Sequence, residues 1–158
     1  SLITVTVCVL DGALLFQCTG IVYEFDDAIK TTKILTSSRI CCKLWHPKLK
    51  VFVHLSNDTK VEARFLFFNK HYQVALLQIV TEHTLMPASF GSRPNYDQQV
   101  FFLGRDKDYL LIVRSGSILG LEQPFAGQNH YLFSRAGSPV ACTGGPVIDK
   151  HGQVIGIM

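Results

Sequence analysis

Short apolar runs separated by polar turns recur along this chain of 158 residues, and this pattern limits the folds that it can adopt. Alternation of apolar and polar residues over such short runs is typical of β-strands, and no long segment has the 3.6-residue period of a helix. A first group of strands is predicted at residues 2–9, 14–25, 33–36, 48–55, 60–68 and 74–80. A second group is predicted at residues 98–103, 109–121, 131–134, 145–148 and 153–158. Strands at this close spacing predict a β-barrel or a β-sandwich.

Two other segments complete the pattern. Residues 37–43 are expected to form one helical turn, capped by Ser37 or Ser38. Residues 81–97 have little periodicity and contain two prolines and a glycine, which predicts a connector between the two strand groups. With 47% apolar and 17% charged residues, the chain can bury a core as one domain or as two small packed lobes. Its apolar runs are far shorter than the roughly 20 residues of a membrane span, so we expect no transmembrane helix and no membrane partner.

The number and spacing of the cysteines do not favour a disulfide framework. Their number is odd, no CxxC spacing occurs, and the neighbours Cys41 and Cys42 would form a strained bridge. We therefore expect free thiols and a reducing, intracellular location such as the cytoplasm, the nucleus or an organelle. No cluster of histidine, cysteine and carboxylate residues has metal-ligand spacing, so no metal and no cofactor is expected. The formal net charge of +3 does not by itself indicate a nucleic-acid partner.

A glycine-rich stretch near the end of the chain carries the most specific motif. Thr143-Gly144-Gly145-Pro146 is followed by an apolar pair, a polar turn and a second apolar pair, as in a tight loop that leads into a β-hairpin. It resembles the nucleophile loop of trypsin-like serine proteases, most closely the HtrA/Deg branch, whose pattern is Gly-Asn-Ser-Gly-Gly-Pro. Both glycines and the proline match in place. Thr143 holds the position of the nucleophilic serine, and the two residues before it are Ala141 and Cys142.

Weaker matches to the same family follow in the family's order. They are residues 17–22, 34–39, 73–77, 100–104 and 113–118. The resemblance implies an all-β fold of two six-stranded barrels, with an N-terminal barrel at residues 1–85 and a C-terminal barrel at residues 86–158. Because the chain stops at Met158, we expect the second barrel to lack its last strand and the C-terminal helix. The resemblance also implies homo-oligomers, since HtrA/Deg proteins commonly form trimers.

The resemblance places three residues at the positions of the catalytic triad. Thr143 stands for the serine, Arg39 for the histidine and Gln73 for the aspartate. A guanidinium does not lose its proton in a protein, and an amide carries no charge to stabilise an imidazolium. Ala141 occupies an oxyanion-loop position, together with Cys142 and Gly144, where alanine carries a steric penalty that glycine lacks. We therefore expect no functional catalytic residue and a protease homologue that acts in binding, scaffolding or regulation.

Two alternatives from other classes stay open. One is an active peptidase with Thr143 or Cys142 as an unorthodox nucleophile, for which His71 could serve as the base of Cys142. The other is a basic adaptor for nucleic acid.

A basic stretch suggests where a partner would bind. No acidic residue occurs from Ala28 to Asn57. A solvated basic rim would give the same pattern, and the stretch alone favours that simpler interpretation. Because Arg39 would also lie in the former catalytic cleft, our hypothesis is a surface for an acidic protein or peptide, ahead of nucleic acid. The residues expected to form it are Arg39, Lys43, Trp45, Lys48 and Lys50.

Overall fold

The computed structural model describes residues 2–9, 14–43, 49–55, 59–70, 72–92, 94–122, 130–133 and 143–158. Six strands form a closed barrel in the order β1-β2-β3-β6-β5-β4. They are β1 (Leu2–Val9), β2 (Leu14–Asp26), β3 (Thr31–Ser37), β4 (Leu49–His54), β5 (Lys60–Asn69) and β6 (Val74–Val80). Antiparallel pairing of β1 with β4 closes the barrel. A 3-10 helix, η1 (Ser38–Lys43), follows β3.

Strict alternation along the strands builds the core of this barrel. In β3 and β6 every second side chain is buried, which is the period that a half-buried strand requires. The inward-facing residues meet in one apolar cluster, whose buried members are Cys18, Val22, Ile34, Ile40, Val51, Val53, Leu55, Ala75, Leu77 and Ile79.

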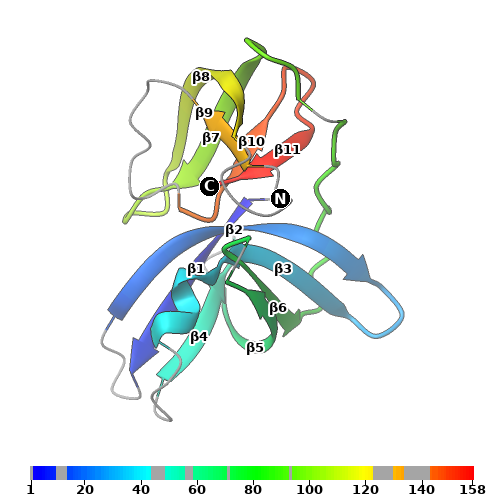
Figure 1. Ribbon diagram of the computed structural model, residues 1–158. Helices are drawn as coiled ribbons and strands as arrows, with labels where there is room; N and C mark the ends of the chain where they lie inside the picture. Colours follow the sequence, from blue (N-terminus) through cyan, green and yellow to red (C-terminus); the bar gives the residue numbers. More distant parts are fainter. Residues whose placement is uncertain are drawn as a thin grey trace.

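The remaining strands form a curled five-stranded sheet in the order β11-β10-β7-β8-β9. They are β7 (Gln99–Arg105), β8 (Leu111–Glu122), β9 (His130–Phe133), β10 (Pro146–Ile148) and β11 (Val154–Ile157). This sheet lies beside the barrel, above β2 in the view of Figure 1. Its described core is small, with Val100, Phe102, Ile118 and Val147 as the buried members. The all-β, two-barrel expectation is confirmed, with the second unit present as an open sheet.

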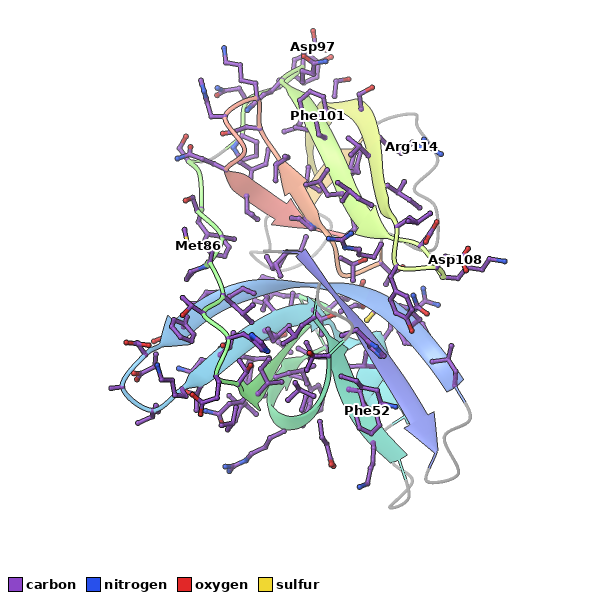
Figure 2. The ribbon with its side chains drawn as sticks, turned by 180° about the vertical axis from the view of Figure 1, so that it is seen from behind. Phe52, Met86, Asp97, Phe101, Asp108 and Arg114 are labelled. Atoms are coloured by element: carbon purple, nitrogen blue, oxygen red, sulfur yellow. The ribbon has the colours of Figure 1, made fainter. Side chains whose placement is uncertain are left out.

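A connector links the two units between Val80 and Gln99 and carries no named strand. The N–H of Ala88 donates to the carbonyl of Val22 in the barrel. Two further bonds join the connector to the second sheet, from Val154 N–H to the Ser89 carbonyl and from Gly91 N–H to the Val154 carbonyl. Met86 lies on this connector where it passes from one unit to the other (Figure 2). The proposed boundary between residues 85 and 86 falls within it and stays a prediction.

Local chemistry explains where the observed elements differ from the predicted ones. Residue 109 was expected to start a strand, but Tyr109 has φ = 65° and belongs to the turn before β8. The Asp106 carboxylate accepts the N–H groups of Asp108 and Leu110, which fixes this turn. The expected helical turn is η1, and the Ser37 hydroxyl caps it by accepting the Arg39 N–H at 3.2 Å. The remaining strands agree with the predictions to within two residues at each end.

Candidate functional site

The glycine-rich loop at residues 143–145 is inserted between the barrel and the second sheet. Gly144 has φ = 80°, in the left-handed region. A Cβ atom at this position would lie 2.3 Å from the Thr19 carbonyl oxygen and 2.9 Å from both the Ser37 nitrogen and the Thr36 Oγ1. Only glycine therefore fits here, and its backbone sits directly against the end of β3.

Backbone hydrogen bonds fix the loop on both sides. The Thr19 N–H in β2 donates to the Thr143 carbonyl at 2.9 Å. On the other side, the Gly144 N–H donates to the Met158 carbonyl at 2.7 Å, and the Met158 N–H donates to the Gly145 carbonyl at 2.9 Å. The loop thus ties the barrel to the end of the chain, next to β11.

The segments that carry Arg39 and Gln73 are joined on the barrel side of this loop. Arg39 follows β3 directly, and the N–H of its neighbour Ser38 donates to the Gln73 carbonyl at 3.0 Å. Gln73 has φ = 57° in the turn before β6. Since Gly144 contacts Ser37, the structure brings the backbones at residues 37–39, 73 and 143–144 to one place, although they are far apart in the sequence.

The side chains at these positions form no proton-transfer chain. Arg39 and Gln73 are exposed, and no hydrogen bond joins their side chains to each other or to Thr143 among the described residues. The Arg39 guanidinium lies 5.9 Å from the centre of the Phe16 ring, at the distance of a cation–π contact. This contact leaves a permanent cation on the barrel side of the loop.

Buried polar groups that no sequence motif indicates lie beneath the loop. The Thr36 hydroxyl donates to the Thr19 carbonyl at 2.7 Å and lies 3.2 Å from the Cys18 sulfur. The Thr19 hydroxyl accepts the N–H of Arg105 from β7 at 2.9 Å. Burial raises the pKa of the Cys18 thiol to about 11, so this thiol stays protonated at neutral pH and is a poor nucleophile. Of these contacts, the bond from the Arg105 N–H to the Thr19 hydroxyl joins the two sheets at the site.

The expected basic surface is only partly described. Ala141, Cys142, His71, Trp45 and Lys48 lie outside the described residues, and Lys43 ends η1. Three lysines of the acid-free stretch have carboxylate partners from flanking segments of the barrel. These salt bridges are Lys30 to Asp27 at 2.6 Å, Lys33 to Glu24 at 3.0 Å and Lys50 to Glu62 at 3.5 Å. The stretch is free of acids in sequence but not in space, because hairpin pairing brings acidic residues of β2 and β5 beside it.

Comparison with known proteins agrees with this architecture. The sequence profile of the family described as "Trypsin-like peptidase domain" matches residues 18–157. The chain belongs to this family. The comparison with curated protein sequences gave no match.

Solved protease structures have the same fold as this trypsin-like domain. The crystal structure of Deg5 is similar with a TM-score of 0.79 and 21% identity, over 99% of this chain and 78% of that one. The active form of the Rv3671c protease from M. tuberculosis is similar with a TM-score of 0.77 and 20% identity, over 99% and 68%. Its inactive form gives 0.71 and 20%, over 98% and 75%. At this identity the similarity establishes the fold. In the part of the chain that the structure describes, no helix is both long and apolar enough to cross a membrane.

Proposed function

We propose that this trypsin-like domain is catalytically inactive and that its former active-site cleft binds a protein or peptide segment with acidic residues. One observation carries the proposal. The backbones at residues 37–39, 73 and 143–144 come together. At the positions that the resemblance assigns to the base and the carboxylate, the chain has the permanent cation of Arg39 and the neutral amide of Gln73. A site with this geometry keeps the surface for a peptide but lacks the groups that move a proton.

Electrostatics favours an acidic partner. Arg39 is exposed, and among the described residues its guanidinium has the Phe16 ring but no carboxylate as a neighbour. A charge-assisted hydrogen bond from this guanidinium to a carboxylate would contribute about 1–3 kcal/mol. The buried free thiol of Cys18 is consistent with a reducing, intracellular location, which we keep as part of the proposal.

Two measurements test the proposal. A fluorophosphonate probe should not label the domain, and casein should stay intact in its presence. Peptides selected from a random dodecamer phage library should then bind less tightly to Arg39→Glu than to the parent, and less tightly as salt concentration rises. Lys107→Glu is the matched control, because Lys107 is an exposed cation in a turn of the second sheet.

The outcomes separate the alternatives. Labelling that disappears in Thr143→Ala, or thiol-dependent cleavage that disappears in Cys142→Ala, would show an active peptidase and refute the proposal. Equal affinity of the parent and Arg39→Glu at all salt concentrations would show that Arg39 does not contact a partner.

A further inference from the structure

Part of an apolar run in β5 lies on the outer face of the barrel, where the fold does not bury it. Phe65-Leu66-Phe67-Phe68 lies in β5, and the register of β5 with β6 shifts between Phe65 and Phe67. Leu66 is therefore the extra residue of a β-bulge, which breaks the alternation of inward and outward side chains. As a result Leu66 and Phe67 lie on the outer face and remain 37% and 56% exposed. Consecutive exposed apolar residues of this kind commonly mark an interaction site.

Strand register shows which apolar residues share this face. Phe67 pairs with Leu76 in β6, and Leu76 pairs with Leu35 in β3. Directly paired residues of neighbouring strands point to the same side of a sheet. Leu35, Leu66, Phe67 and Leu76 thus form a continuous surface across three strands, which we call the apolar shelf.

Positive charge borders the apolar shelf. Arg64 lies in the next row of the sheet, where it pairs with Gln78, and Lys70 follows the end of β5. Both side chains are exposed. The nearby acids are already engaged, Glu24 with Lys33 and Glu62 with Lys50. Among the described residues Arg64 and Lys70 take part in no salt bridge, so the border of the shelf carries uncompensated positive charge.

We propose that the apolar shelf is a second docking surface, for a short protein segment in which an apolar side chain is flanked by carboxylates. The apolar side chain packs on Phe67 and Leu66, and the carboxylates pair with Arg64 and Lys70. The four residues of the shelf are far fewer than the roughly 20–30 residues that each partner contributes to a stable protein interface. Its two free cations are also fewer than the about four to eight of a segment that binds anionic membranes. The shelf differs from the former cleft in its residues, since it contains none of Arg39, Gln73 and Thr143.

Peptide selection with paired variants tests this proposal. A random dodecamer phage library is selected against the folded domain, and the affinity of each enriched peptide is measured by calorimetry. A class of peptides with Asp or Glu beside Phe, Leu or Trp should appear. Its affinity should fall about tenfold or more in Phe67→Ser and in Arg64→Glu, as is common for anchor residues. The same peptides should bind Arg39→Glu as tightly as the parent.

Matched controls show that a loss of affinity is local. Val80→Ser removes an equally exposed apolar residue, 65% exposed, two rows away on the same barrel face. Lys107→Glu reverses an exposed charge on the other sheet. Neither variant should change the affinity. The melting temperature of Phe67→Ser should equal that of the parent, because the side chain is largely outside the core.

Four results would overturn the proposal. The first is selection of peptides that depend on Arg39 alone, which would leave the proposed function of the cleft standing. The second is a failure to enrich any peptide, or enrichment of peptides without carboxylates. The third is a dimer in sedimentation velocity that dissociates in Phe67→Ser, since the occupant would then be a second copy. The fourth is sedimentation with phosphatidylserine vesicles that is lost in the same variant.

Discussion

At the scale of single residues, the contacts of Gly144 give the Gly-Gly-Pro loop a packing role that does not depend on catalysis. Because glycine has no Cβ, the Thr19 carbonyl oxygen and the Ser37 backbone nitrogen can both lie close to the Gly144 backbone. The loop therefore has a packing role between the two sheets. Retention of this motif is then no evidence for a working nucleophile at Thr143.

Substitution of Gly144 tests this packing role. We expect Gly144→Ala to lower the free energy of unfolding by about 2–4 kcal/mol, because a Cβ would combine left-handed strain with overlap against backbone atoms that cannot move aside. Gly152→Ala is the control. It has nearly the same φ of 77°, but a Cβ there meets nothing within 4 Å, so its cost should be near the strain alone, about 1–2 kcal/mol. Urea unfolding followed by fluorescence measures both, and equal costs would contradict the packing role.

The sequence motifs predicted which backbone segments form the site, but not the hydrogen bonds that support them. The motif at residues 143–146 and the segment at residues 34–39 were sufficient to expect that Thr143 and Arg39 come together. The supporting groups could not be expected in the same way. Thr19 and Thr36 are ordinary strand threonines in the sequence, and only the packing of two sheets makes them hydrogen-bond partners.

At the scale of elements, alternation predicted most strands and failed where a single residue changed the register. The bulge at Leu66 brought Phe67 to the outer face, which the unbroken apolar run did not show. The carboxylate of Asp106 kept Tyr109 in a turn that the apolar pattern had assigned to a strand. The acid-free stretch acquired acidic neighbours because β2 and β5 pair with its strands. These are effects of pairing between strands, so no single strand carries their signal.

The contact between β4 and the turn before β8 gives the fold a dependence on pH. His54 lies with its ring centre 5.1 Å from that of Tyr109. Burial, together with the nearby Lys60 ammonium, lowers the pKa of His54 below its usual value of 6.5. The folded protein therefore holds His54 neutral, whereas the unfolded chain takes up a proton as the pH falls through about 6.5. This contribution to stability is present above that pH and is lost below it.

Replacement of His54 by an aromatic ring that cannot titrate isolates its contribution to the pH dependence of stability. The free energy of unfolding of the parent should fall as the pH is lowered from 7.5 to 5.5. In His54→Phe, which keeps an aromatic ring against Tyr109, the decline over the same range should be smaller. Urea unfolding at several pH values gives both curves. Parallel curves would mean that another group causes the pH dependence.

At the scale of the whole molecule, the second sheet depends on the barrel. Its described core contains four buried residues, against ten in the barrel. Three bonds cross between the units near the site: Thr19 N–H to the Thr143 carbonyl, Arg105 N–H to the Thr19 hydroxyl and Gln17 Nε2 to the Asp106 carbonyl. Asp108 lies in the same turn, where the second sheet reaches down to the barrel (Figure 2). Because these bonds join the second sheet to the barrel, the stability of the sheet should depend on this junction.

Two threonine-to-valine variants test the dependence with matched chemistry. Both Thr19 and Thr32 are fully buried in the barrel. The Thr19 hydroxyl accepts the Arg105 N–H from the second sheet, whereas the Thr32 hydroxyl has no hydrogen-bond partner among the described residues. Thr19→Val leaves a backbone donor unpaired at the junction and should lower the free energy of unfolding by about 1–3 kcal/mol. Thr32→Val removes a hydroxyl that bonds nothing and should be neutral or stabilising.

Hydrogen exchange shows which part of the molecule is destabilised in Thr19→Val. In Thr19→Val, the amides of β7 and β8 should exchange faster relative to those of β3 and β6, because the second sheet loses a contact on which it relies. In Thr32→Val the exchange of both units should match the parent. If the two variants have the same stability and the same exchange pattern, the Thr19 junction does not hold the second sheet. The sheet would then be stabilised by its own core and by the connector at residues 88–91.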